Sequence, residues 1–182
     1  RLPPDIDRTV AAFTEIVTVS VQALHRFDRF AHARRNIVGI WGDGNLGYIT
    51  SLFFRYMYPD TKLIIFGTDK EKLNSFSFAD ETYLVWDVPE NVEIDHAFEC
   101  VGGDASQKAI NQIIDLIHPE GAISLLGVSE YPIPINTRMV LEKGLRLFGS
   151  SRSSREDFEK TVEMYQKHPE ILGYLSNIVG AQ

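Results

Sequence analysis

Short apolar runs alternate with helical patterns along most of this chain. From Asn36 onward, six runs of mainly apolar residues have the length expected of buried parallel strands. The stretches between them have the spacing of amphipathic helices, and prolines fall at or near the joints. The predicted strands are residues 37–42, 62–67, 82–86, 95–100, 121–127 and 145–150, and the predicted helices are residues 45–58, 69–78, 104–117 and 153–168.

The segment before the first strand has a different pattern. Apolar positions at helical spacing predict one helix over residues 8–32, with Asp7 placed to cap its start. We therefore predict a leading helical part, residues 1–35, and a sheet domain, residues 36–182. At the other end of the chain, Ser153 or Ser154 is placed to cap the last predicted helix.

Six strands joined by crossover helices predict an α/β fold. The expected architecture is a doubly wound, six-stranded parallel sheet, because right-handed crossovers leave few other topologies. Residues 128–144 form the one long connection. This connection follows the fifth strand, at the carboxyl edge of the sheet where ligands of open α/β folds bind, so it is a candidate active-site loop.

Composition narrows the possible partners. The formal net charge of −7 argues against a nucleic-acid partner, since phosphate backbones select basic surfaces. No apolar run approaches the roughly 20 residues that cross a bilayer, so we expect no membrane partner. The single cysteine, Cys100, excludes an internal disulfide and fits a reducing cytoplasm. Because the chain starts with Arg and shows no obvious closing element, we expect a fragment.

Residues 42–47 read GDGNLG, which has the spacing G-x-G-x-x-G. The motif ends a predicted strand and opens a predicted helix inside a βαβ unit, which is the context that a dinucleotide fingerprint requires. We expect the first glycine to allow a tight turn, the second to admit the pyrophosphate and the third to let the helix press on the strand. The alternative is a turn without a ligand. The candidate cofactor-binding residues here are Gly42, Asp43, Gly44, Asn45, Leu46 and Gly47.

The end of the second predicted strand bears on the choice between NAD and NADP. In NAD binders an acidic residue about 20 positions after the glycine loop binds the adenosine ribose. Gly67 takes that place, and we expect it to leave room for a 2′-phosphate. Thr68 can donate a hydroxyl, and Lys70 or Lys72 can supply positive charge, which favours NADP(H). Asp69 keeps NAD open, because it becomes the ribose acid if the turn is shifted.

The ends of the fourth and fifth predicted strands carry small residues. Cys100, Val101 and Gly102 would let the backbone pass the nicotinamide ribose, and backbone groups of Gly127 and Val128 could meet the nicotinamide amide. For the cysteine, a small buried hydrophobe is a more common role than a reactive thiol.

Five motifs in this order make the chain similar to a known family. They read GDGNLG, FGTDKEKL, DHAFECVGG, HPEGAISLLGVSEY and LEKGLRLFGSSRS. Together they resemble the cofactor domain of the medium-chain, zinc-dependent alcohol dehydrogenase superfamily. The stretch from SLLGVSEYPIPIN to GSSRSSREDF resembles more narrowly the ribulose-5-phosphate reductases, or ribitol-5-phosphate dehydrogenases, of bacterial teichoic acid synthesis. The resemblance implies a Rossmann domain and covers nearly the whole chain.

The resemblance also implies an activity. The expected reaction is the NADPH-dependent reduction of D-ribulose 5-phosphate, a sugar phosphate, to D-ribitol 5-phosphate, with a Zn²⁺ ion polarising the ketone. A cytidylyltransferase that activates the product is then an expected partner. In the family the zinc lies in a separate N-terminal domain that carries a Cys and a His-Glu pair. No Cys precedes Cys100 and no His-Glu dipeptide occurs here, so we expect this fragment to lack that catalytic domain and to be inactive alone.

Two further expectations come from the same resemblance. In polyol-dehydrogenase relatives a glutamate before the cofactor domain lies beside the zinc, and Glu15 matches that place; the alternative is a helix-end or interface glutamate. The last strand of such sheets often pairs with its copy, so residues 145–150 suggest a homodimer. No residue of this chain is assigned a catalytic role.

Two other functions stay open at this stage. One is an NAD-dependent zinc dehydrogenase that acts on an unphosphorylated polyol or amino alcohol. The other is a Rossmann module that senses a dinucleotide and regulates a partner. A sensor of this kind is expected to carry a DNA-binding helix pair or a coupling linker, and neither is visible in the sequence.

Overall fold

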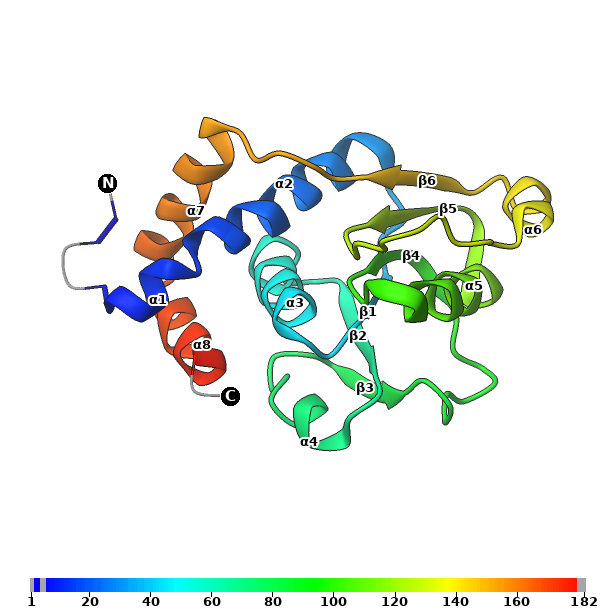
Figure 1. Ribbon diagram of the computed structural model, residues 1–182, viewed down its shortest axis with the longest axis horizontal. Helices are drawn as coiled ribbons and strands as arrows, with labels where there is room; N and C mark the ends of the chain where they lie inside the picture. Colours follow the sequence, from blue (N-terminus) through cyan, green and yellow to red (C-terminus); the bar gives the residue numbers. More distant parts are fainter. Residues whose placement is uncertain (1, 4–5, 180–182) are drawn as a thin grey trace.

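A parallel sheet of six strands forms the centre of the molecule (Figure 1). The computed structural model describes residues 2–3 and 6–179. The strand order is β3-β2-β1-β4-β5-β6, and every neighbouring pair is parallel. The predicted doubly wound α/β fold is therefore confirmed. The strands are β1 (Ile37–Trp41), β2 (Lys62–Gly67), β3 (Glu81–Leu84), β4 (Ile94–Glu99), β5 (Ile117–Leu125) and β6 (Arg146–Gly149).

Helices cover both faces of this sheet. Alternation along each strand sends Leu63 and Ile65 of β2 into one hydrophobic cluster and Ile64 and Phe66 into another, as the two-residue period of a strand requires. α2 and α3 contribute to the first cluster and α5 to the second. The helices are α1 (Arg8–Ala12), α2 (Thr14–Phe30), α3 (Asn45–Met57), α4 (Lys70–Leu73), the 3₁₀ turn η1 (Gly103–Ala105), α5 (Ser106–Leu116), α6 (Thr137–Glu142), α7 (Arg155–Lys167) and α8 (Glu170–Val179).

Several predicted helix bounds were wrong. The single helix expected over residues 8–32 is interrupted at Phe13, whose N–H donates to the Val10 carbonyl in a tight turn. The helix expected over residues 69–78 ends at Leu73, and the chain beyond it buries Phe76 instead. The connection at residues 128–144 contains α6. In the described part of the chain, no helix is both long and apolar enough to cross a membrane.

The leading helix α2 shares a core with the sheet. Val21, Leu24 and Phe27 of α2 are fully buried in the same cluster as Val38 and Ile40 of β1. The division predicted at residue 35 stays a prediction, but the packing makes α2 an integral layer of the fold.

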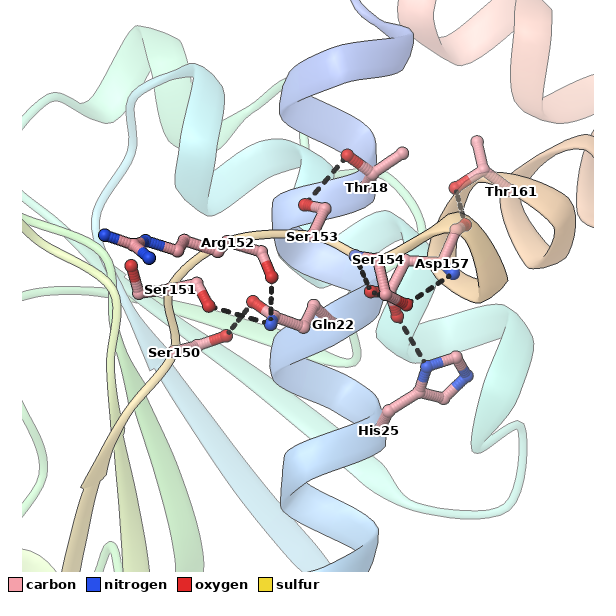
Figure 2. Close-up of polar contacts among 10 residues, drawn as sticks. All are labelled: Thr18, Gln22, His25, Ser150, Ser151, Arg152, Ser153, Ser154, Asp157 and Thr161. Carbon is pink, nitrogen blue, oxygen red and sulfur yellow. Dashed lines mark hydrogen bonds and ion pairs between the residues drawn. The ribbon is translucent and has the colours of Figure 1, made fainter.

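A polar joint also fastens α2 to the segment that follows β6 (Figure 2). Gln22 Nε2 donates to the carbonyl oxygens of Ser151 and Arg152, at 2.9 and 2.6 Å, and Ser150 Oγ donates to Gln22 Oε1 at 2.9 Å. Arg152 has a positive φ of 64°, a conformation that costs free energy for a residue with a side chain. The Gln22 side chain therefore holds a turn that the local sequence does not favour.

The same joint starts α7. Ser154 and Asp157 form a capping box, which confirms one of the two predicted cap residues. Asp157 Oδ1 also lies 2.8 Å from His25 Nδ1 of α2. Ser153, the other candidate, instead accepts a hydrogen bond of 3.0 Å from Thr18 (Figure 2). The last predicted helix and α2 are thus linked by polar contacts as well as by packing.

Candidate functional site

The glycine loop has the geometry that its sequence predicts. Gly42 has a φ of 125°, and a Cβ there would lie 2.9 Å from the Cys100 carbonyl oxygen, so no other residue fits this turn. A Cβ at Gly47 would lie 1.9 Å from the Gly42 carbonyl oxygen, which is how closely α3 presses on the strand end. Gly44 precedes α3, is exposed and has open space beside it, whereas Leu46 is half-buried in the first turn that Asn45 begins.

Asp43 has a role that the sequence analysis did not foresee. Its Oδ2 accepts hydrogen bonds from the N–H groups of Thr68 and Asp69, at 2.6 and 2.7 Å, and from the Thr68 hydroxyl at 3.3 Å. A Cβ at Gly67 would lie 2.7 Å from this carboxylate oxygen. A side chain at residue 67 would therefore collide with Asp43, and the room for a 2′-phosphate beside Gly67 stays a prediction.

A cavity of about 450 Å³ opens beside this loop at the carboxyl edge of the sheet. Its volume lies in the range typical of small-molecule sites. Segments that are distant in sequence line it, because parallel strands end at one edge. The predicted residues that line the cavity are Gly42, Asp43 and Gly44 after β1, Gly67 and Thr68 after β2, and Cys100 and Val101 after β4.

Two aromatic residues that were not predicted from the sequence also line this cavity. The rings of Trp41 and Phe66 stack with centroids 3.8 Å apart and planes 9° from parallel. Gln112 of α5 accepts from Trp41 Nε1 at 2.9 Å and donates to the Val85 carbonyl at 2.7 Å, which fixes the indole ring. A signal was present: Trp41 and Phe66 each directly precede a loop glycine, and they are register partners in adjacent strands.

The basic residues are placed differently from the prediction. Lys70 and Lys72 are exposed on α4 and do not line the cavity, whereas Lys108 of α5 does. Asp69 Oδ1 accepts hydrogen bonds from the N–H groups of Glu71 and Lys72 and so caps α4. This capping role leaves the predicted ribose acid engaged with the backbone of its own turn.

Cys100 is a buried packing residue in this structure. Burial raises the pKa of its thiol to about 12, so the sulfur stays protonated at neutral pH. The Sγ atom lies 3.8 Å from the Thr50 hydroxyl. These observations favour the small buried hydrophobe over the reactive thiol.

The turns after β4 and β5 lie side by side. The Gly103 N–H donates to the Val128 carbonyl at 2.8 Å, and Gly102 has a positive φ of 75°. Val128 is 84% exposed. Gly127 lines a second hollow, of about 280 Å³, under residues 129–135. The structure thus brings Gly102, Gly127 and Val128 together, on the other side of the glycine loop from Gly67.

Glu15 lies apart from these turns. It is exposed on α2 and lines a shallow groove between α2 and α7. The described residues contain no group of three or more His, Cys, Asp or Glu side chains that could hold a metal ion. The role predicted for Glu15 beside a zinc ion therefore stays a prediction.

Comparison with known proteins points in one direction. A family model described as "Zinc-binding dehydrogenase" matches residues 80–167. Ribulose-5-phosphate reductase of Bacillus spizizenii is 55% identical over 182 residues, which are 100% of this chain and 53% of that protein. Ribulose-5-phosphate reductase 1 of Staphylococcus aureus is 51% identical over 181 residues, again 100% of this chain and 53% of the relative.

A solved structure agrees with these relatives. The crystal structure of S. aureus TarJ in complex with NADPH matches with a TM-score of 0.92 and 52% identity, over 96% of this chain and 55% of that one. The chain is therefore similar, over its whole length, to members of the medium-chain, zinc-dependent alcohol dehydrogenase superfamily. It spans about half the length of the curated relatives that it matches.

Similarity to the alcohol dehydrogenase superfamily implies a dinucleotide and a zinc ion, and these two groups fit the chain differently. The exposed Gly44, the N-terminus of α3 and the cavity beside them form a cradle that suits a dinucleotide. Zinc does not fit the described residues, because a zinc site needs at least three protein ligands and Glu15 has no partners of that kind. A zinc ion in a member of this superfamily with these residues would need ligands from elsewhere.

Proposed function

We propose that this chain is the dinucleotide-binding half of an NADP(H)-dependent reductase. The whole protein would reduce D-ribulose 5-phosphate to D-ribitol 5-phosphate, taking hydride from the bound cofactor. The observation that carries the proposal is the match to TarJ, a structure in complex with NADPH, over 96% of this chain at 52% identity. The substrate class comes from the ribulose-5-phosphate reductases that are 51% and 55% identical to it.

The glycine loop would bind the pyrophosphate. The backbone at Gly44 is exposed, and the first N–H groups of α3, beginning at Asn45, have no partners within their own helix. Helix N-termini attract anions through these N–H groups and the helix dipole. The contacts of Gly42 and Gly47 keep the loop in the conformation that presents these groups.

The adenosine half would lie in the cavity between the ends of β1 and β2. Gly67 and Thr68 border it, and Lys108 is the basic side chain placed to meet a phosphate there. Lys70 and Lys72 are exposed on the neighbouring helix and can add a positive field at longer range. Val85 lines the same cavity and is half-buried, so it can supply apolar surface for the purine ring, whereas Trp41 and Phe66 are fully buried beneath it.

The nicotinamide half would extend across the ends of β4 and β5. Cys100 and Val101 border the cavity on this side, and Gly102, Gly127 and Val128 continue the surface. The two glycines keep these turns free of side chains that would block the nicotinamide ribose and amide. The exposed Val128 would lose its contact with water when the ring is bound.

We place the zinc ion of the whole protein outside the described residues. When bound, zinc would act as a Lewis acid that polarises the ketone. Glu15 is the one residue of this chain that we propose beside the metal, since it is exposed on α2 and free to face a second domain. Residues 1–35 would join that catalytic domain to the dinucleotide-binding residues 36–182.

One observation favours a second candidate, an NAD-dependent zinc dehydrogenase of an unphosphorylated polyol. The Asp43 carboxylate lies over Gly67, where a negative charge repels a 2′-phosphate and could instead accept from ribose hydroxyls. We rank this function second because the similarity to a structure with NADPH extends over nearly the whole chain.

Cofactor titration tests the choice directly. Trp41 lines the cavity, so tryptophan fluorescence reports binding there. We expect NADPH to bind at least about tenfold more tightly than NADH, which corresponds to about 1.4 kcal/mol. The chain by itself should not oxidise NADPH with ribulose 5-phosphate, whereas a protein that includes the N-terminal half should. Tighter binding of NADH, or activity with an unphosphorylated ketose only, would favour the second candidate.

We also propose a homodimer, a functional partner and a location. β6 is an edge strand whose outer side has no neighbouring strand among the described residues, so a second copy could pair with it. A sedimentation experiment that gives twice the chain mass would support this dimer.

A cytidylyltransferase would consume the ribitol 5-phosphate, and co-purification would test a physical association. The cytoplasm, where reduced nicotinamide cofactors are regenerated, is the proposed location, which cell fractionation checks.

A further inference from the structure

A buried carboxylate ends β4. Glu99 is 1% exposed, and no ion pair of the described residues involves it. Burying an ionised carboxylate without a cation costs several kcal/mol unless hydrogen-bond donors replace the lost water. The donors around Glu99 therefore decide why it is tolerated.

Four donors from both turns converge on this carboxylate. Oε1 accepts from the Val101 N–H at 2.8 Å, the Gly102 N–H at 3.1 Å and the Ser106 hydroxyl at 2.9 Å. Oε2 shares the Gly127 N–H, at 3.2 Å, with the backbone carbonyl oxygen of Glu99, which accepts from it at 3.0 Å. An ionised carboxylate only accepts hydrogen bonds, so it matches this set, whereas a side chain with a donor group does not.

The Glu99 carboxylate links two separate turns. Val101 and Gly102 belong to the turn after β4, and Gly127 belongs to the turn after β5. A Cβ at Gly127 would lie 2.4 Å from Glu99 Oε1, so the turn approaches as closely as a glycine permits. The hydrogen bond from the Gly103 N–H to the Val128 carbonyl joins the same two turns.

These two turns lie on one side of the bound dinucleotide. The pyrophosphate binds at the glycine loop after β1, and the adenosine half lies toward the end of β2. The strand order β3-β2-β1-β4-β5-β6 then places the ends of β4 and β5 on the nicotinamide side. A shift of either turn would move the nicotinamide ring without moving the adenosine.

We propose that Glu99 is a positioning residue for the nicotinamide half of the cofactor. It acts through the backbone of Val101, Gly102 and Gly127, which it holds in one arrangement by accepting their N–H groups. The inference rests on the proposed function, since it assumes that the cavity binds a nicotinamide dinucleotide. Replacing the carboxylate by an amide turns one acceptor into a donor that faces an N–H group. This repulsion would weaken the contact between the turns after β4 and β5, and the nicotinamide half would bind less tightly.

Two ligands separate this role from a general structural one. NADPH contacts both halves of the site, whereas 2′,5′-ADP carries only the adenosine half with its phosphates. In Glu99→Gln we expect NADPH affinity to fall about tenfold, as the loss of a charged hydrogen bond predicts. The affinity for 2′,5′-ADP should stay within about twofold. Calorimetric titration of both ligands measures the two affinities, and the fluorescence of bound NADPH should shift toward that of the free cofactor.

Two other variants complete the design. Glu130→Gln removes a carboxylate from an exposed position near the same turn, so both affinities should match those of the wild-type chain. Ser106→Ala removes one donor and keeps the carboxylate, and we expect a loss of a few-fold for NADPH only. If Glu99→Gln does not fold by circular dichroism, Ser106→Ala decides the matter.

The outcomes are distinct. Selective loss of NADPH affinity in Glu99→Gln and Ser106→Ala supports the positioning role. An equal loss for both ligands, or no loss in folded variants, overturns it while the proposed function stands. A wild-type chain that binds neither NADPH nor 2′,5′-ADP overturns the proposed function and this inference with it.

Discussion

Two carboxylates brace the carboxyl edge of the sheet, one within the glycine loop and one at the end of the neighbouring strand β4. Asp43 follows β1 and accepts N–H groups from the turn after β2. Glu99 ends β4 and accepts N–H groups from its own turn and from the turn after β5. Both side chains replace water around the backbone of a neighbouring turn, so their chemistry is the same.

Their surroundings differ. Asp43 is half-buried at the rim of the cavity and engages its turn through one oxygen, whereas Glu99 is 1% exposed and uses both oxygens. A charge at the rim acts on whatever ligand enters, but a buried charge that its donors saturate acts mainly on the backbone. Hydrogen bonds from backbone N–H groups to a carboxylate can therefore serve two purposes. At Asp43 the carboxylate is placed to select the ligand, whereas at Glu99 it fixes the shape of the site.

The largest effect should come from the glycine loop that both sides share. In Gly47→Ala the new Cβ would lie 1.9 Å from the Gly42 carbonyl oxygen, so the loop cannot keep its shape. We expect the free energy of unfolding to fall by about 4 kcal/mol or more, and binding of NADPH and of 2′,5′-ADP to be lost together. Urea unfolding and calorimetric titration measure these changes.

Gly173→Ala is the matched control for that variant. Gly173 also lies in a helix, and a Cβ there would meet nothing within 4 Å. The stability of this control should stay equal or rise slightly, because alanine favours helix. A Gly47→Ala chain that binds 2′,5′-ADP normally would show that the two sides do not share the loop, and the comparison would need to be redrawn.

Acid should lower the stability of the fold through β4, the strand that carries Glu99. His96 of β4 is fully buried, and this burial, followed by the nearby His32, lowers its pKa from 6.5 to about 4. The folded state then binds fewer protons than the unfolded state between these two pH values, so stability falls as the pH drops from 6.5 toward 4. The total loss is up to about 3 kcal/mol from this group.

Thermal unfolding at a series of pH values measures the loss. His96→Gln retains a neutral side chain with an acceptor for the Ala122 N–H, which His96 Nδ1 accepts at 3.0 Å. The stability of this variant should change less across the same pH range. Equal slopes for the two proteins would rule out His96 as the source of the acid sensitivity.

The smallest effect should come from the rim carboxylate, Asp43, and should change the ratio of cofactor affinities. Asp43→Asn keeps an oxygen that can accept from Thr68 and Asp69 but removes the negative charge beside Gly67. We expect NADPH affinity to rise several-fold relative to NADH, since only NADPH carries the 2′-phosphate that this charge repels. Fluorescence titration of both cofactors gives the ratio.

Asp60→Asn, an exposed change before β2 at the opposite edge of the sheet, should leave the ratio of cofactor affinities unchanged. An Asp43→Asn ratio equal to that of the wild-type chain would mean that the rim carboxylate does not sense the cofactor. Asp43 would then be a structural brace like Glu99, and the contrast between the two sides would disappear.

Local patterns were sufficient to predict most of the fold. The six strands were expected within a few residues, since short apolar runs and flanking turn residues are encoded along the chain. The roles of Gly42 and Gly47 in the turn were also predicted, because the G-x-G-x-x-G spacing implies a close approach of helix and strand. The break at Phe13 was missed, because helical periodicity continues through it.

The details of the site depended on contacts between distant segments. Lys70 and Lys72 have the charge and position along the chain that an NADP site suggests, yet Lys108, about 40 residues later, lines the cavity. Asp43 was predicted as a loop residue, but its partners at Thr68 and Asp69 come from the next turn. The motif FECVGG drew attention to its small residues and not to Glu99.

The sequence by itself therefore determined the class of fold, the turn that the glycine loop forms and the family that the chain resembles. Only the tertiary structure decided the strand order, which lysine side chain lines the cavity and which groups donate to the two carboxylates. The physical reason is that periodicity and turn chemistry act over a few residues, whereas a hydrogen-bond partner depends on which segments the sheet brings to one edge. Asp43 and Glu99 acquire their separate roles at that edge.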